Sequence, residues 1–288
     1  MDSTITNSNL AQQRNEGIIE EMKYIPIDLP GLWYTQLNQH LNKKEYGRLC
    51  RELAKPKYAV VKASEALKLH DAGALQVKNK IRIIWLHDIE APCENWLGEE
   101  MAELEASYGL SSTHNVRIFS VMEKELLAPL KRIVTLGGEI QYQYEDLVAT
   151  SGDAKAARKL FGENLAVIRK HFPKVNVAFA HGVYRSGIDA TKQFYSRGKW
   201  DPATWKQFGI HPCGELYYFM TVLCERHKEK FHYFGESKHL GADEFLAGLR
   251  TVELGDIVMF LQHPSYWSTI VDIERWKKCL RKSSFFKK

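Results

Sequence analysis

Residues 81–90 read Ile81-Arg82-Ile83-Ile84-Trp85-Leu86-His87-Asp88-Ile89-Glu90. The first six form a short apolar run rich in β-branched residues, which predicts a buried strand over 81–86 rather than a helix. The stretch then changes to His87, Asp88 and Glu90, three ionisable groups whose burial is costly unless something pairs or uses them. In α/β folds, sites are built at the carboxyl ends of strands. The stretch therefore predicts a functional site at the end of a buried strand.

Apolar runs of strand length alternate with helical spacing from residue 80 onward. Expected strands cover residues 81–86, 113–119, 139–143, 175–180, 216–219, 231–234 and 256–262, and expected helices cover 94–108, 123–135, 153–171 (capped by Ser151), 202–208, 243–251 and 269–281. Repeated strand–helix units are typical of a parallel sheet with helices outside it. About seven strands, with no Gly-x-Gly-x-x-Gly after the first, favour a distorted, incomplete (β/α) barrel over a dinucleotide-binding sheet.

The rest of the chain is expected to frame this α/β barrel. Residues 1–23 are polar and predict a flexible N-terminus. Residues 24–288 are expected to form one domain, divided into an N-terminal cap (24–78), the barrel core (79–268) and a C-terminal helix with a basic tail (269–288). Helical spacing at 37–53 and at about 62–72 makes the cap a helical extension.

The composition excludes some classes of protein. A hydrophobic content of 44% and a charged content of 26% are ordinary for a globular protein. The net charge of +5 is mild, and no basic stripe is interleaved with aromatics, so we predict no nucleic-acid partner. The chain shows neither a signal peptide nor an apolar run of about 20 residues, which predicts a cytoplasmic protein. Five scattered cysteines without a Cys-x-x-Cys pair indicate free thiols.

Four expected strands end in polar chemistry. The segments that follow them are His87-Asp88-Ile89-Glu90, Gln143-Tyr144-Glu145-Asp146, His181-Gly182 and His263-Pro264. If the strands are parallel, all four ends meet on one rim and gather carboxylates, a carboxamide and imidazoles in one mouth. That inventory suits a divalent metal with a general acid and a general base.

Each of these residues also has a structural interpretation. A histidine at a strand end is often simply hydrogen-bonded within the fold. Asp88 and Glu90 lie on the same side of an extended chain and could cap a helix or pair with a lysine. Trp267 could belong to the core. It is the coincidence of four strand ends that favours a site.

The same residues, in this order, resemble the polysaccharide deacetylase family, and within it the cytoplasmic-type branch. His87-Asp88-Ile89-Glu90 is similar to that branch's His-Asp-x-Asp motif, and Gly137-Gly138-Glu139-Ile140-Gln141-Tyr142-Gln143-Tyr144-Glu145-Asp146-Leu147 is similar to its Gly-His-Glu-Ile-Gly-Tyr-His-Tyr-Glu-Asp-Leu stretch. Ala180-His181-Gly182 and Gln262-His263-Pro264 resemble its Met-His-Gly and Thr-His-Pro motifs. The resemblance covers residues 80–268.

The resemblance implies an incomplete (β/α) barrel with a metal on its rim, zinc being the expected metal. It implies that Asp88 is the general base on a water molecule, that Glu90 is a metal ligand, and that His263 protonates the departing amine. Hydrolysis of an amide needs these functions, because the water must be activated and the leaving group needs a proton.

The chain departs from the family pattern at two places. Gln143 occupies the position of a metal-binding histidine, and a carboxamide oxygen is a poor ligand for zinc. Leu147 stands where a second histidine of the pair would be. His87, His181 and Glu145 are the candidates to replace that pair.

Two hypotheses follow. The first is a metal-assisted hydrolase that removes an N-acyl group from a sugar, which the resemblance links to lipopolysaccharide O-antigen or capsule assembly. The second is a degenerate barrel without the metal, which binds saccharide or supports a partner enzyme. Metal-independent chemistry by Asp88 and His263 is a third possibility. Candidate substrate-binding residues, which could stack on sugar rings or meet acidic groups, are Arg117, Gln143, Tyr144, Glu145, Arg185 and Trp267.

The C-terminal residues 275–288 interleave lysine and arginine with Trp276, Phe285 and Phe286. This pattern suits peripheral contact with an anionic membrane surface at the inner face. A solvated helix with a frayed end is the alternative.

Overall fold

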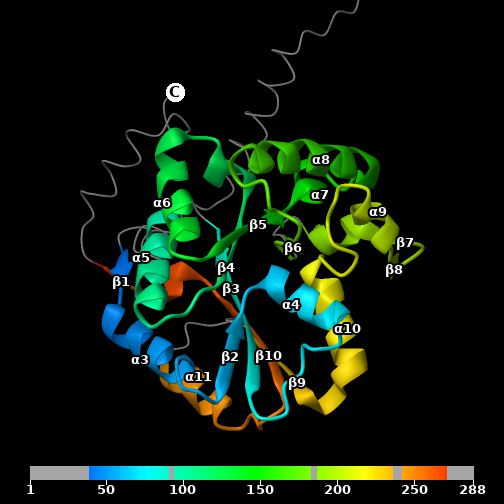
Figure 1. The fold of residues 1–288 in the computed structure, drawn as a ribbon. Helices are drawn as coiled ribbons and strands as arrows, with labels where there is room; N and C mark the ends of the chain where they lie inside the picture. Colours follow the sequence, from blue (N-terminus) through cyan, green and yellow to red (C-terminus); the bar gives the residue numbers. More distant parts are fainter. Residues whose placement is uncertain (1–38, 91–93, 183–186, 236–241, 271–288) are drawn as a thin grey trace, which may run out of the picture.

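The computed structural model describes residues 39–90, 94–182, 187–235 and 242–270. Its centre is a seven-stranded sheet in which every pairing is parallel, with strand order β6-β5-β4-β3-β10-β9 and β2 pairing β3. The strands are β2 (Tyr58–Val61), β3 (Ile81–Ile89), β4 (Thr113–Val116), β5 (Glu139–Tyr144), β6 (Ala178–Ala180), β9 (Phe231–Gly235) and β10 (Ile257–Gln262). The sheet curls into a half-barrel (Figure 1), which fits the expected distorted, incomplete α/β barrel.

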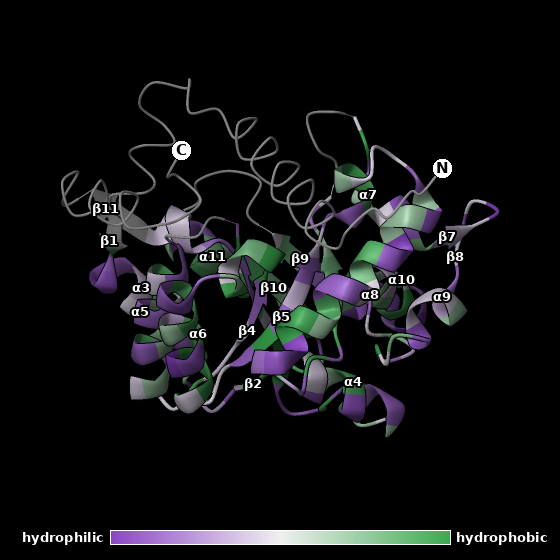
Figure 2. Cartoon of the chain, turned by 90° about the horizontal axis from the view of Figure 1, so that it is seen from above, coloured by the Kyte–Doolittle hydropathy of each residue, from purple (hydrophilic) through white to green (hydrophobic). Residues whose placement is uncertain are grey.

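Helices cover the sheet on its outer side and fill its open side. They are α3 (Lys43–Leu53), α4 (Ala63–Asp71), α5 (Glu94–Ser107), α6 (Lys124–Thr135), α7 (Asp146–Ala149), α8 (Ala154–His171), α9 (Pro202–Lys206), α10 (Leu216–His227) and α11 (Ala242–Leu249). Short antiparallel ribbons join β1 (Gln39–Leu41) to β11 (Ser268–Ile270) and β7 (Tyr195–Ser196) to β8 (Lys199–Trp200). Hydrophobic stripes on the helices alternate with hydrophilic ones (Figure 2), because each helix buries only one side.

Strand β3 contributes side chains to two separate cores. Ile83 and Trp85 belong to an outer core with residues of α3 and α11, whereas Ile84 and Leu86 belong to an inner core with residues of α4 and α10. Successive side chains of a strand point to opposite faces, so this alternation decides which polar residues near the end of β3 face the interior. Helix α10 contacts both edge strands, β6 and β9, and so covers the open side of the half-barrel.

Strand β2 lies within the segment expected to be a cap. It pairs with the first half of β3, from Ile81 to Ile84, while β4 pairs with the second half, from Leu86 to Ile89. The two short strands therefore share one edge of β3, end to end. The backbone N–H of Ala63 donates to Thr113 Oγ1 at 2.8 Å and links the end of β2 to the start of β4. Part of the expected cap is thus a strand of the main sheet.

Several local predictions are wrong. The strand expected over 113–119 ends at Val116, and residues 118–121 form a 3-10 helix. Residues 216–219 begin α10 instead of forming a strand, because the Glu215 side chain caps the helix by accepting from the Tyr218 N–H at 2.8 Å. Asp153, not Ser151, caps α8. The helix expected over 37–53 begins only at Lys43, after the strand β1 and the cap residue Asn42.

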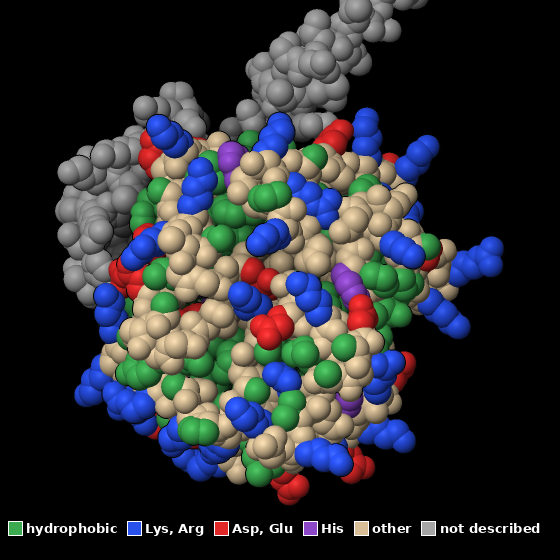
Figure 3. Space-filling view, in the orientation of Figure 1, with side chains coloured by type: hydrophobic (Ala, Val, Ile, Leu, Met, Phe, Trp, Pro, Cys, Tyr) green, Lys and Arg blue, Asp and Glu red, His purple; other side chains and the backbone are tan. Residues whose placement is uncertain are grey.

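The N-terminus that was expected to be flexible, most of the expected C-terminal helix and the basic tail lie outside the described ranges. Among the described helices, none has both the length and the apolar character needed to cross a bilayer. On the face seen in Figure 3, lysine and arginine side chains are spread over the surface between acidic ones. The cysteines that the structure describes, Cys50, Cys213 and Cys224, are free thiols.

Candidate active site

Four predicted residues come together at the carboxyl end of the sheet. Asp88 is the last residue but one of β3, and Glu90 follows that strand directly. His181 follows β6, and His263 follows β10. Glu90 Oε1 lies 3.1 Å from His181 Nε2 and 3.4 Å from His263 Nε2. Because β6 and β10 stand on opposite sides of β3 in the sheet, only the curl of the sheet lets one carboxylate contact both histidines.

Asp88 faces the interior of the half-barrel and is only 3% exposed. Its Oδ1 accepts from Asn115 Nδ2 at 2.8 Å and its Oδ2 accepts from Gln143 Nε2 at 3.0 Å. Burial raises the pKa of Asp88 to about 7, although nearby His263 and the Asn115 hydrogen bond act in the opposite direction. A carboxylate with this pKa can take up a proton near neutral pH, which is what a general base requires.

Glu90 is the charged centre of the site. Burial alone would raise the pKa of Glu90, but the hydrogen bonds to His181 and His263 outweigh it and hold that pKa well below its ordinary value. Burial would lower the pKa of His181, yet the contact with Glu90 raises it. Glu90 is therefore ionised where Asp88 is only partly so, which gives two neighbouring carboxyls different roles.

A buried ion pair closes one side of the site. The Arg117 guanidinium, 4% exposed, donates to both carboxylate oxygens of Glu145, with Nε to Oε1 at 2.8 Å. Its Nη1 also donates to the carbonyl oxygen of Glu90 at 3.2 Å. His181 Nδ1 lies 4.0 Å from Glu145 Oε2. The sequence predicts that Arg117 and Glu145 contact substrate, and the structure places both beside Glu90 and His181.

The structure adds three residues that sequence reasoning missed. Asn115 holds Asp88, as described above. Glu94, 5% exposed, accepts from the Glu90 N–H at 2.6 Å, and burial together with the charge of Glu90 raises its pKa to about 7. Tyr217 stacks on Phe179, with ring centroids 4.7 Å apart, and burial together with Asp88 raises its pKa. Asn115 could have been found from its place two residues into the strand that follows the first motif.

Three predicted site residues do not reach this rim. His87 lies on the opposite face of β3 from Asp88, is fully buried, and its Nε2 lies 2.8 Å from Glu105 Oε1 of α5. The grouping of His87 with Glu90 and His181 is therefore wrong, because side chains alternate along a strand. Tyr144 is buried in the core, where its hydroxyl donates to Glu215 at 3.2 Å. Trp267 is also core, packed on Tyr46 and Phe245. Arg185 lies outside the described residues.

Gln143 holds the side chain of Asp88 in place. It stands where the resemblance places a metal-binding histidine, but its amide group donates to Asp88. Its Oε1 is buried without a hydrogen-bond partner among the described residues. The donors that fit a metal are elsewhere on the rim. Glu90 Oε1 lies 3.1 Å from His181 Nε2, and ligand atoms of Asp88, Glu90 and His263 lie within 4.8 Å of one another. Carboxylate oxygen and imidazole nitrogen are donors that zinc accepts, so the residues present fit the expected metal.

Comparison with known proteins adds no identification. No family model matches the chain, and no curated protein matches it. The resemblance to polysaccharide deacetylases accordingly rests on the motifs alone.

Proposed function

We propose that this protein is a polysaccharide deacetylase-like hydrolase that cleaves the C–N bond of an N-acyl group on a sugar. One observation carries the proposal: Asp88, Glu90, His181 and His263, delivered by three different strand ends, meet at one rim. Amide hydrolysis requires a general base that titrates near neutral pH and groups that can hold a metal or donate a proton. An ionised carboxylate and two imidazoles beside the base meet that requirement. The substrate class is an N-acylated intermediate of a surface polysaccharide, such as lipopolysaccharide O-antigen or capsule, met in the cytoplasm.

The residues divide the work as follows. Glu90 and His181 would hold the metal, which when bound supplies Lewis-acid polarisation of the acyl carbonyl. Asp88 accepts the proton of the water that adds to the acyl carbon. His263 donates a proton to the sugar nitrogen as the C–N bond breaks, so the products are a carboxylic acid and a free amine. Asn115 and Gln143 hold Asp88 in place through their amide groups.

A second candidate function rests on the hydrogen bonding of the same residues. Glu90 is paired with two histidines, and Asp88 with two carboxamides. A barrel with this self-contained network could bind saccharide, or support a partner enzyme, without hydrolysing anything.

The deciding experiment incubates the full-length protein with N-acetylated sugars and zinc, manganese, cobalt or nickel, and measures released acetate. Asp88→Asn should lower the rate by roughly 100-fold or more, since it removes the base. Asp146→Asn is the matched control, because Asp146 is likewise buried with a pKa raised to about 7 but bonds to Tyr142 and Asn164. Sugar binding without acetate release from any substrate or metal would favour the second candidate.

A further inference from the structure

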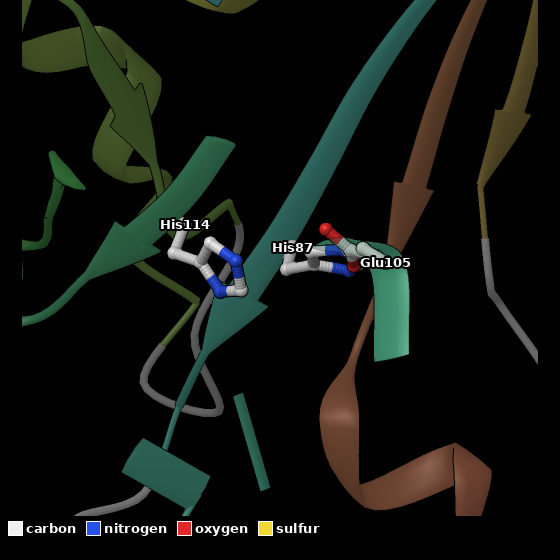
Figure 4. Close-up of side chains that lie close together, drawn as sticks. All are labelled: His87, Glu105 and His114. Carbon is white, nitrogen blue, oxygen red and sulfur yellow. The ribbon is translucent and has the colours of Figure 1, made fainter. Parts of the chain in front are cut away.

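A buried polar cluster lies between the sheet and α5, beside several hydrophobic side chains. His87 of β3, His114 of β4 and Glu105 of α5 are 0%, 0% and 1% exposed, on the outer face of the sheet (Figure 4). Around them the β3 and α5 side chains are hydrophobic, among them Ile83, Trp85 and Met101. Two imidazoles and a carboxylate at the same depth need a compensating partner, because buried polar groups are costly without one.

The three side chains converge on one another. His87 Nε2 lies 2.8 Å from Glu105 Oε1, and the two histidine rings lie 4.8 Å apart between centroids. One ligand atom from each of the three residues lies within 4.8 Å of the other two. In a tetrahedral zinc site with bonds of about 2.0–2.1 Å, neighbouring ligand atoms are about 3.3 Å apart. Small side-chain rotations would therefore bring these donors to bonding distance of one ion.

Hydrogen bonds within the protein leave the cluster incompletely satisfied. Glu105 accepts from Tyr46 Oη at 2.6 Å and from Ser112 Oγ at 2.6 Å. Among the described residues no lysine or arginine pairs with this carboxylate, and Nδ1 of both His87 and His114 is buried without a hydrogen-bond partner.

We propose that His87, Glu105 and His114 are the ligands of a structural divalent metal of the zinc class. Two imidazole nitrogens and one carboxylate oxygen suit zinc or cobalt far better than magnesium or calcium, which prefer oxygen. The Tyr46 hydroxyl, 3.3 Å from His87 Nε2, lies beside these donors where a fourth ligand would come. The ion would be enclosed, as structural zinc is, and distinct from any metal held at the rim.

This proposed metal site lies next to the candidate active site, and the two sites share no residue. His87 and His114 are partners in the parallel register of β3 and β4, and the next pair along is Asp88 and Asn115. An ion that bridges the two histidines on the outer face would hold the two strands together where Asp88 and Asn115 project inward. Its role would be to fix the strand ends.

The test uses full-length protein with the double variant Glu90→Gln/His181→Gln, which removes both side chains proposed to hold a metal at the rim. The protein is produced with zinc, dialysed against EDTA and analysed for metal content. We expect about one zinc per chain to remain, because the cluster of His87, Glu105 and His114 is buried and the chelator cannot reach it. A zinc-free double variant that is folded by circular dichroism would overturn the proposal.

Two further measurements identify the ligands. His114→Asn and Glu105→Gln, each added to the rim variant, should reduce the retained zinc at least tenfold, whereas Asn95→Ser, at another fully buried polar residue of α5, should leave it unchanged. If the His114→Asn and Glu105→Gln variants fail to fold, the X-ray absorption spectrum of the zinc in the rim variant still identifies its ligands. Two imidazoles with oxygen ligands support the assignment, and sulfur or all-oxygen coordination contradicts it.

Discussion

Asn115 donates a hydrogen bond of 2.8 Å to Asp88, its direct partner in the parallel register of β4 and β3. The bond crosses between neighbouring strands on the interior face, so backbone pairing itself holds the two side chains together. Gln143, on the next strand, donates to the other carboxylate oxygen. Three adjacent strands thus fix the orientation of one buried carboxyl, whose ionisation decides the chemistry proposed for the rim.

The pH dependence of hydrolysis should follow the ionisation of Asp88. Because burial raises the pKa of Asp88 to about 7, and a general base must be ionised, kcat/KM should fall about tenfold per pH unit below 7. Above pH 7, kcat/KM should no longer rise with pH. The measurement is initial acetate release between pH 5 and 8. An acid limb near pH 4 would mean that another group, with an ordinary carboxyl pKa, is the base.

Replacing Gln143 by methionine should shift the acid limb of the kcat/KM pH profile to higher pH. The substitution removes the N–H that donates to Asp88 Oδ2 while keeping similar volume, so the ionised form of Asp88 loses a hydrogen bond. The pKa of Asp88 should rise, and the acid limb should shift upward by roughly one pH unit. Gln141→Met is the control, since Gln141 accepts from the backbone of residues 176 and 177 and should leave the limb in place.

Removing only one partner of the Arg117–Glu145 pair should lower the stability of the protein strongly. Arg117→Met leaves the buried Glu145 carboxylate without its bidentate partner, which should cost about 3–5 kcal/mol in the free energy of unfolding. The double variant Arg117→Met/Glu145→Met should recover part of that loss, because no unpaired charge remains. Urea unfolding of both variants measures the difference. Equal losses in the single and double variants would contradict an uncompensated charge.

Glu215 should make the protein less stable as pH rises. Burial raises the pKa of Glu215 to about 8, so the folded chain holds its proton through a range where the unfolded chain has released it. The stability that Glu215 contributes is complete below its unfolded pKa of about 4.5 and is lost as pH rises toward 8. Relative to wild type, Glu215→Gln should therefore gain at least about 1 kcal/mol between pH 5 and 8.

Urea unfolding at several pH values measures that difference. Lys199→Gln, a change of an exposed charge, serves as the comparison. A difference between Glu215→Gln and wild type that stays constant with pH would show that Glu215 is ionised in the folded protein.

Local patterns predicted much of the candidate site. Asp88, Glu90, His181 and His263 were identified from the residues at strand ends, because parallel strands place those ends on one edge. Trp267 was misplaced because it lies beyond β10, in the 3-10 helix Pro264–Trp267, and packs on Tyr46 and Phe245. Reasoning from strand ends misplaced His87 and Tyr144. Adjacent positions at a strand end look equally available in the sequence, yet only every second one faces the interior.

The sequence by itself determined the alternation of strands and helices, since apolar periodicity and capping residues act over a few positions. It also determined that ionisable groups stand at the strand ends. Only the tertiary structure decided that β2 shares an edge of β3, that residues 216–219 are helical, and that His87 lies against Glu105 while Asp88 lies against Asn115 and Gln143. These outcomes depend on which distant segments pack against each face, and a free energy summed over such long-range contacts cannot be read from neighbouring residues alone.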